Sequence, residues 1–168
     1  MRVTICQWDS RPALFASQQQ ALFAHCQAVS SELLLLPELP FDDWLAASSE
    51  VDSQRWALSV MRHLQALQQF SALTGAALLA TRPVVDGSGL RFNRGCLWSG
   101  ELGALDIRDK LHLPEEQGYW EASWCQPGAG QFDSVEVGAC RLGLLICSEL
   151  WFLEHARNYG QQGVHLLC

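Results

Sequence analysis

Hydrophobic residues in the first third of the chain alternate between short continuous runs and longer amphipathic segments. Residues 3–8 are a short β-rich run, and residues 33–36 are four consecutive leucines closed by Pro37. Such an apolar run, ended by proline, is typical of a strand that is buried on both faces. Between the two runs, apolar side chains recur with helical spacing, at Phe15, Leu22, Cys26 and Val29. The pattern predicts a strand, a helix and a second strand.

A second amphipathic segment predicts another helix. Its apolar stripe consists of Trp56, Val60, Leu64 and Leu67. Gly75 is expected to end this helix, because glycine adopts the left-handed conformation of a helix C-terminus without strain. The apolar residues 76–81 then predict a further buried strand.

The middle of the chain predicts a pair of antiparallel strands. Residues 86–89 (Asp-Gly-Ser-Gly) and 99–100 (Ser-Gly) are turn sequences. The runs beside them, 91–98 and 104–109, are therefore expected to be antiparallel neighbours. Residues 113–130 are irregular and contain proline and glycine together with tyrosine and tryptophan. This composition is typical of a packed functional loop.

The C-terminal part of the chain returns to short strands and a helix. Strands are predicted at residues 132–137 and 141–147, a helix at 150–159 ended by Gly160, and a last strand at 164–168. Strands, hairpins and helices in this order give a mixed α/β sheet covered by helices. The last strand has no polar cap after it, so we expect the chain to be cut within a longer fold.

Composition narrows the class of protein. Of the 168 residues, 49% are hydrophobic and 17% are charged, which is typical of a globular domain and not of a disordered chain. The 18 acidic and 11 basic side chains give a net charge of −7, so neither nucleic acid nor an anionic membrane is expected as a partner. The apolar runs are too short to span a membrane. The N-terminus has no export signal, so a cytoplasmic location is expected.

The seven cysteines are irregularly spaced and odd in number. In a cytoplasmic protein such cysteines are interpreted as reduced thiols and not as a disulfide framework. The sequence contains no C-x-x-C pair, so a zinc site is not expected. A thiol redox or zinc protein stays an alternative that a metal assay would test.

Three reactive side chains directly follow or end runs that are predicted to be strands. They are Glu38, Cys147 and Lys110, the single lysine beside ten arginines. Sites in α/β sheets collect at the carboxyl ends of buried strands. A cysteine at a strand-to-helix turn suits a nucleophile, and a lysine can stabilise a thiolate or an oxyanion. Each also has an ordinary interpretation. Glu38 would be a solvated carboxylate, Cys147 would be a buried thiol that packs as a small hydrophobic residue, and the single lysine would reflect a compositional preference for arginine.

Together, these segments resemble three sequence blocks of the nitrilase, or carbon–nitrogen hydrolase, superfamily. The blocks are residues 34–38 (Leu-Leu-Leu-Pro-Glu), Asn93 with residues 109–114 (Asp-Lys-Leu-His-Leu-Pro), and residues 143–152 with Glu154 and Arg157. The order of Glu, Lys and Cys and their spacing agree with the family. Scaffold roles are assigned to Asn93, His112, Glu154 and Arg157. The resemblance implies a four-layer αββα sandwich, of which residues 1–168 form a partial domain that is incomplete at its C-terminus.

The resemblance also implies roles for individual residues. Glu38 would be the general base, Cys147 the nucleophile and Lys110 the group that stabilises the tetrahedral intermediate. The backbone N–H of Ser148 would complete the oxyanion site. Glu121, which precedes an aromatic run ending in Pro-Gly, would be a further catalytic glutamate. This chemistry requires no metal or organic cofactor.

The implied reaction is hydrolysis of a non-peptide carbon–nitrogen bond of a small molecule through a cysteine thioester. Ser148-Glu149 follows the cysteine where true nitrilases have Trp, which favours an amide or carbamoyl substrate over a nitrile. Trp44, Trp120 and Trp151 each lie within six residues of a proposed catalytic side chain. Some of them are expected to line an apolar acyl pocket, and packing of the sandwich is an equal alternative. A homo-oligomer is expected.

A second class of function stays open on the same sequence. A nitrilase-like fragment without catalysis would bind a partner chain, because the strand at 164–168 offers an edge for pairing. Coding sequence beyond residue 168 would favour the enzyme.

Overall fold

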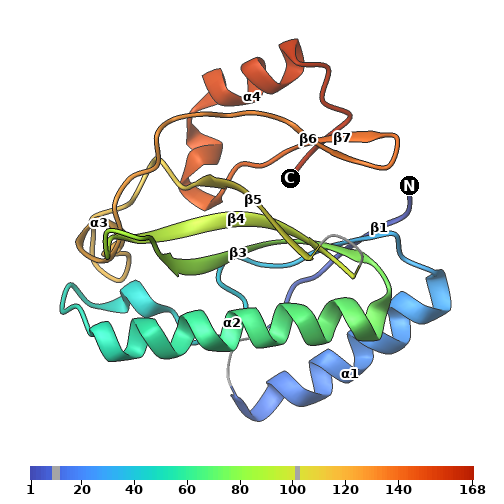
Figure 1. The fold of residues 1–168 in the computed structure, drawn as a ribbon, viewed down its shortest axis with the longest axis horizontal. Coiled ribbons are helices and arrows are strands. Elements are labelled where there is room, and N and C mark those ends of the chain that lie inside the picture. Colours follow the sequence, from blue (N-terminus) through green and yellow to red (C-terminus); the bar gives the residue numbers. More distant parts are fainter. Residues whose placement is uncertain (9–11, 101–102) are drawn as a thin grey trace.

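The chain folds into two β-sheets that lie between two layers of helix (Figure 1). The computed structural model describes residues 1–8, 12–100 and 103–168. Helices α1 (Pro12–Val29) and α2 (Ser53–Thr74) form one outer layer, and helix α4 (Leu153–Gln161) forms the other. A five-stranded and a three-stranded sheet lie between them. This arrangement confirms the α/β sandwich of four layers predicted from the sequence.

The larger sheet follows the order of the chain. Its strands are β1 (Val3–Ile5), β2 (Leu33–Leu35), β3 (Ala77–Val85), β4 (Arg91–Ser99) and β5 (Gly103–Asp109). The first three strands are parallel, and β4 and β5 are each antiparallel to the strand before them. Two reversals bring β5 back to the direction of β2 and β3. The carboxyl ends of β2, β3 and β5 therefore lie at one edge of the sheet.

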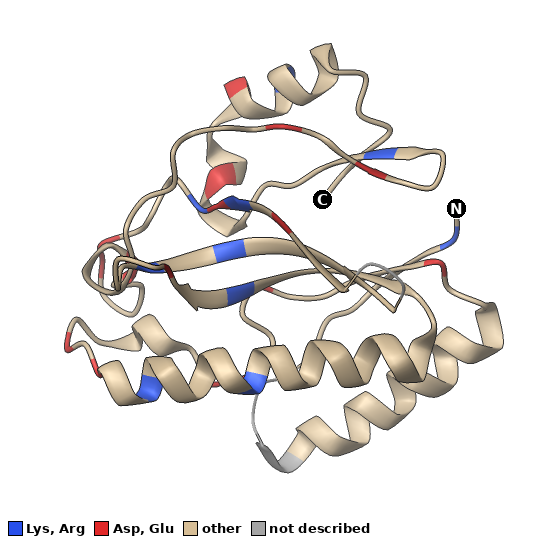
Figure 2. Cartoon of the chain, viewed as in Figure 1, with Lys and Arg blue, Asp and Glu red and all other residues tan. Residues whose placement is uncertain are grey.

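Helices α1 and α2 cover the outer face of this sheet (Figure 1). The core between them contains Cys26 of α1, Leu67 and Phe70 of α2, and Leu34 and Leu78 of the sheet. Figure 2 shows that α1 carries no charged residue, whereas basic residues lie on β3, β4 and β5. Within the described residues, no helix is long and apolar enough to cross a membrane.

The smaller sheet packs its apolar face against the larger one. It consists of β6 (Val135–Val137), β7 (Cys140–Gly143) and β8 (Leu166–Leu167), in the order β6-β7-β8. The core between the sheets joins Leu33, Leu79 and Leu97 of the larger sheet to Leu142 and Ile146. On the outer side, Tyr159 of α4 packs against Phe132 and Leu145. Burial of apolar surface on both faces thus holds the sandwich together.

The predicted apolar stripe of α2 is wrong at one position. Leu64 is 37% exposed, and the buried face instead includes Ser59 and His63. Nδ1 of His63 lies 2.8 Å from the carbonyl oxygen of Ser59, so the buried imidazole has a hydrogen-bond partner. Gly75 ends the helix as predicted, with a φ of 68°.

The C-terminal elements differ from their predicted bounds. Strand β7 ends at Gly143, and Cys147 begins a 3-10 helix, η2 (Cys147–Trp151). Helix α4 starts only at Leu153 and continues through Gly160, so the predicted stop is wrong. The glycine in the left-handed conformation is Gly163, with a φ of 71°. Glycine weakens a helix without necessarily ending it.

Two short helices complete the described structure. The 3-10 helix η1 (Leu45–Ala47) follows β2, and the one-turn helix α3 (Glu121–Trp124) lies within the irregular segment 113–130. Trp124 and Cys125 of this segment are buried against Trp56 of α2. The segment is therefore a packed loop, as its composition indicated.

Candidate active site

Glu38 lies in a tight corner just beyond the carboxyl end of β2. The next residue, Leu39, has a φ of 43°, which is uncommon for a residue with a side chain. Its N–H donates a hydrogen bond to Oγ1 of Thr81 on β3, at 2.7 Å. The N–H of Phe41 donates to Nε2 of His63 on α2, at 3.3 Å. The corner is thus anchored to a strand and to a helix, and this fixes the position of the carboxylate.

Lys110 follows β5 at the same edge of the sheet, and its side chain is fully buried. Its Nζ donates to Oε1 of Glu38 at 2.8 Å and also to Oε2 of Glu121. Burial alone would lower the pKa of the Lys110 ammonium, but the carboxylates of Glu38 and Glu121 together outweigh burial and raise it. The lysine therefore stays charged.

Glu121 begins helix α3 and is buried beside these two residues. Burial and the nearby carboxylate of Glu38 raise the pKa of Glu121, while Lys110 and Asn93 act against them. Nδ2 of Asn93 donates to Oε1 of Glu38 at 2.8 Å and to Oε1 of Glu121 at 3.2 Å. The two carboxylates thus share two donors, one charged and one neutral.

Asn93 therefore belongs to the site, although the sequence pattern assigned it to the scaffold. It is 1% exposed and lies on β4, which pairs with β3 on one side and with β5, the strand that leads to Lys110, on the other. Its place in the second family block was the only signal in the sequence. That signal does not say which side chains the amide binds.

Cys147 lies at the point where the chain turns from the smaller sheet into η2. Its φ is 48° and its side chain reaches solvent. Partial burial and the nearby carboxylate of Glu38 raise the pKa of Cys147, and the ammonium of Lys110 lowers it. Glu38 and Cys147 both line a cavity of about 150 Å³ between the two sheets. The structure thus brings Glu38, Lys110, Glu121 and Cys147 together.

Glu149, two residues after the cysteine, is fully buried in an ion pair with Arg108 of β5. Burial by itself would raise the pKa of Glu149, but Arg108 and two backbone N–H groups bind the carboxylate and lower it. Neither residue was predicted to take part in the site. The two are 41 positions apart, and local sequence patterns do not show which charges meet.

Ser148 is not among the residues that line the cavity at Cys147. Its hydroxyl donates to the carbonyl oxygen of His112 at 2.6 Å, and the residue lines a groove of about 650 Å³ with Trp151 and Phe152. Its N–H lies in the first turn of η2, where backbone N–H groups lack an acceptor within the helix.

The three tryptophans near the site differ in their surroundings. Trp151 is 86% exposed and lines the groove beside Ser148. Trp44 and Trp120 pack partly buried against the cluster around Trp56, and Nε1 of Trp44 donates to the carbonyl oxygen of Gly118 at 2.9 Å. None of the three is among the residues that line the cavity at Cys147. Their contact with a substrate stays a prediction.

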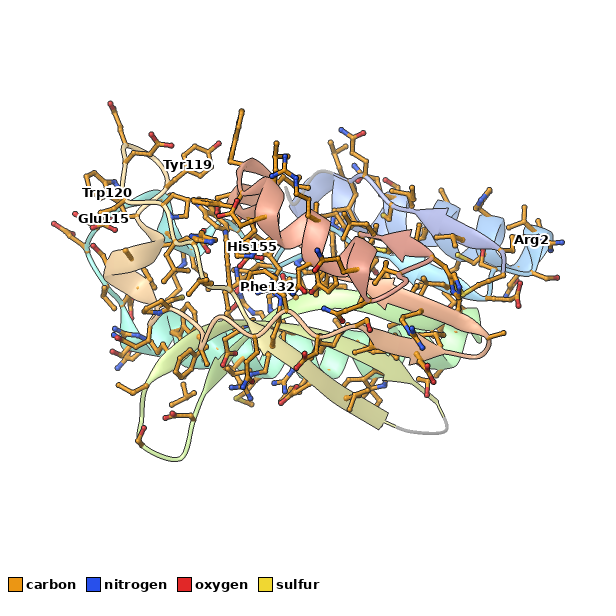
Figure 3. The ribbon with its side chains drawn as sticks, turned by 90° about the horizontal axis from the view of Figure 1, so that it is seen from above. Arg2, Glu115, Tyr119, Trp120, Phe132 and His155 are labelled. Carbon is orange, nitrogen blue, oxygen red and sulfur yellow. The ribbon has the colours of Figure 1, made fainter. Side chains whose placement is uncertain are left out.

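A stack of aromatic rings supports the segment after Lys110. The ring of His112 stacks on Phe152 at 3.5 Å, and the ring of His155 stacks on Phe132 at 3.7 Å. The Nε2 atoms of the two histidines are 2.8 Å apart. Figure 3 shows His155 and Phe132 close together, whereas Trp120 lies toward one end of the molecule. The stack joins the loop after β5 to η2 and α4.

Comparison with known proteins gives a consistent result for the whole chain. The family model for carbon–nitrogen hydrolases matches residues 2–168. A protein of Pseudomonas protegens described as a hydrolase in the pqqF 5′ region is 28% identical over 171 residues, covering 99% of this chain and 58% of that protein. N-carbamoylputrescine amidase of Arabidopsis thaliana is 35% identical over 63 residues, which are 38% of this chain and 21% of the amidase.

Among solved structures, an amidase from Nesterenkonia sp. AN1 has a similar fold. It superposes with a TM-score of 0.75 at 20% identity, covering 99% of this chain and 65% of the amidase. The chain thus spans little more than half of the Pseudomonas relative and about two thirds of this structure.

Proposed function

The chain belongs to the carbon–nitrogen hydrolase family, and on this premise we propose that it hydrolyses a non-peptide carbon–nitrogen bond of a small molecule with Cys147 as nucleophile. The observation that carries the proposal is the meeting of four side chains from distant parts of the sequence. Cys147 lines the same cavity as Glu38, and Oε1 of Glu38 lies 2.8 Å from the ammonium of Lys110. Glu121 binds the same ammonium.

In the first half of the proposed reaction, Glu38 acts as general base. It takes the proton of the thiol as Sγ of Cys147 attacks the carbonyl carbon, and the carbonyl oxygen becomes an oxyanion. Two of the three N–H donors of Lys110 go to Glu38 and Glu121; the third is assigned to the oxyanion together with the N–H of Ser148. Glu38 then returns its proton to the leaving nitrogen, and the carbon–nitrogen bond breaks to leave a thioester.

In the second half, the same carboxylate activates water. Glu38 takes a proton from the water molecule, whose oxygen attacks the thioester carbon, and the carbon–sulfur bond breaks. The proton then passes to the departing sulfur of Cys147. Glu121 does not exchange a proton in this scheme; it binds and orients the ammonium of Lys110.

The raised pKa of Cys147 explains why the reaction needs a base in contact with the thiol. A thiol whose pKa lies above its ordinary value is protonated at neutral pH, and the thiol, unlike the thiolate, is a poor nucleophile. Because Glu38 lines the same cavity as this thiol, it is assigned as the base, and proton transfer and attack can then occur together.

We propose an amide or carbamoyl compound as the substrate, in preference to a nitrile. Ser148 follows the cysteine in this chain, and a segment of the chain is similar to N-carbamoylputrescine amidase. Trp44, Trp120 and Trp151 are proposed to contribute to substrate binding. Alanine variants of these residues that stay folded and keep the parent's activity would contradict that role.

The proposal is tested by ammonia release from a panel of amides, carbamoyl compounds and nitriles. Cys147→Ala is expected to release no ammonia, and mass spectrometry of the parent with substrate is expected to find an acyl group on Cys147. Equal release by Cys147→Ala and the parent would refute the proposal. Absence of any adduct, with binding to a partner chain, would favour the non-catalytic alternative. A cytoplasmic location and a homo-oligomer stay predictions.

A further inference from the structure

The segment that carries Cys147 is joined to the segment that carries Lys110 by one buried ion pair. The guanidinium of Arg108 binds the carboxylate of Glu149 at two points: Nη1 donates to Oε1 at 3.0 Å, and Nη2 donates to Oε2. Both side chains are buried. Such a two-point contact fixes orientation as well as distance.

The carboxylate of Glu149 also binds the backbone on both sides of the contact. The N–H of Ile146, the residue before the cysteine, donates to Oε2 at 2.8 Å. The N–H of Leu111, the residue after the lysine, donates to Oε1 at 2.8 Å. One side chain thereby connects the immediate neighbours of Cys147 and Lys110.

The guanidinium of Arg108 also connects the two segments, by donating to their backbone carbonyl oxygens. Its Nη2 donates to the carbonyl oxygen of Leu144 at 2.9 Å, and its Nη1 donates to that of Asp109 at 3.1 Å. Leu144 lies in the extended run that leads to the cysteine, and Asp109 precedes Lys110. The ion pair is therefore bound to backbone atoms at four places around the two catalytic residues.

The turn at Cys147 needs such support because its backbone is strained. A residue with a side chain at a φ of 48° has a higher conformational energy than in the ordinary helical or extended regions. Glu149 closes this turn in both directions: its N–H donates to the carbonyl oxygen of Ile146 at 3.1 Å, and its carboxylate accepts from the N–H of Ile146. Without these bonds the turn would relax.

We propose that Glu149 and Arg108 are positioning residues that hold the thiol of Cys147 against the carboxylate of Glu38 and near the ammonium of Lys110. The inference rests on the proposed function only in taking Cys147 as the nucleophile. Neither residue touches the substrate in this scheme. When the pair is weakened, Cys147 relaxes to an ordinary φ and its thiol leaves Glu38.

Two variants weaken the pair in different ways. Glu149→Gln keeps the size of the side chain and removes its charge. Arg108→Lys keeps the charge and removes the two-point contact, so a change in this variant reports geometry and not charge. Glu136→Gln is the matched control, because Glu136 forms an exposed ion pair with Arg141 at 3.1 Å, on the strands β6 and β7.

The measurement is alkylation of Cys147 by iodoacetamide across pH, resolved by mass spectrometry of the peptides. The buried thiols of Cys26, Cys96 and Cys125 serve as internal monitors of folding. In the parent, partial burial and Glu38 raise the pKa of Cys147, so its alkylation begins at higher pH than for an ordinary thiol. This readout does not depend on any substrate.

In both variants we expect the alkylation midpoint of Cys147 to fall toward that of an ordinary thiol while the buried thiols stay protected. If a substrate is turned over, kcat is expected to fall about 100-fold in Glu149→Gln, with little change in KM, since a small displacement of a reacting group has this effect. A smaller decrease is expected for Arg108→Lys. The control is expected to match the parent in both measurements.

A parent-like profile of Cys147 in both variants, with the buried thiols protected, would overturn the proposal. If both variants expose the buried thiols together with Cys147, the pair is a folding element and the positioning role is rejected. If only Glu149→Gln exposes the buried thiols, the alkylation profile of Cys147 in Arg108→Lys tests the positioning role. A parent that releases no ammonia from any substrate would contradict the proposed function, and the alkylation profiles would still test the positioning role.

Discussion

Lys110 and Glu38 are 72 positions apart in the sequence, yet Nζ of the lysine lies 2.8 Å from Oε1 of the glutamate. They meet because β2 and β5 run in the same direction, so both residues leave the sheet at the same edge. Glu121 and Asn93 complete this group of buried polar side chains. The charges of these side chains depend on one another, so the loss of one counterion or the addition of one carboxylate is expected to change the stability of the whole group.

Replacing Lys110 by methionine is expected to lower the free energy of unfolding at pH 7 by about 3–5 kcal/mol, because the carboxylates of Glu38 and Glu121 lose their counterion. The loss is expected to shrink as the pH falls toward about 4.5, since the pKa of Glu121 is raised by burial and by Glu38, and protonation of Glu121 removes the repulsion between the two side chains. Urea unfolding at both pH values measures the effect. The double variant Lys110→Met/Glu121→Gln is expected to recover part of the stability at pH 7. An equal loss at both pH values would contradict this account.

Asn93→Asp is expected to destabilise the chain by about 3 kcal/mol at neutral pH. The change replaces a donor by a carboxylate at hydrogen-bond distance from Glu38 and Glu121. Burial and like charges raise the pKa of the new carboxyl above its unfolded value, so the cost appears as the pH rises and is small near pH 4. Thermal unfolding across pH measures it. Asn158→Asp, at an exposed position, is the control and is expected to cost less than about 1 kcal/mol; equal costs would refute the prediction.

Gly128→Ala is expected to destabilise the chain by about 1–3 kcal/mol and to reduce turnover. A methyl group there would lie 2.3 Å from the carbonyl oxygen of Asp109, and the N–H of Gly128 donates to the carbonyl oxygen of Lys110 at 2.9 Å. The backbone that carries the lysine would have to move.

Gly87→Ala is the matched control for this change. Nothing lies within 4 Å of a methyl group at Gly87, so its stability is expected to stay within about 0.5 kcal/mol of the parent. Comparison of the two melting temperatures and the two rates of ammonia release tests the prediction. A Gly128→Ala protein as stable and as active as the control would show that the close approach to β5 is unimportant.

Acid is expected to weaken the hydrogen bond by which His63 anchors the corner around Glu38. Burial lowers the pKa of His63 below its ordinary value of 6.5, although hydrogen bonds to the backbone act against this. A group whose pKa is lower in the folded state contributes stability above its unfolded pKa and loses it as the pH falls through its folded pKa. Protonation would also turn Nε2 from the acceptor of the Phe41 N–H into a donor.

The free energy of unfolding is therefore expected to fall with pH below 6.5 less steeply in His63→Gln than in the parent. Chemical unfolding at several pH values measures the slope. His25→Gln, an exposed change on α1, is expected to keep the slope of the parent. The same slope in all three proteins would exclude His63 as the source.

Much of the fold could be predicted from local patterns. Helix α1, the buried strand β2, the helix stop at Gly75 and the antiparallel strands β4 and β5 all follow from hydrophobic spacing and turn residues. The errors have a common cause. The predictions for Leu64 and Gly160 rest on the chemistry of each residue alone, whereas the surroundings decide their roles. Ser59 and His63 form a hydrogen bond on the buried face of α2, and α4 continues through Gly160.

The sequence by itself indicated the family and made Glu38, Lys110 and Cys147 candidates, because these depend on residue type and on spacing along the chain. The resemblance to the family then implied the order of the layers and the role of Glu121. Only the tertiary structure decided which polar groups meet. Asn93 between two carboxylates, and Arg108 paired with Glu149, involve partners 28 to 55 positions apart. A contact of this kind depends on how strands are ordered and how sheets are stacked, and local periodicity carries no information on either.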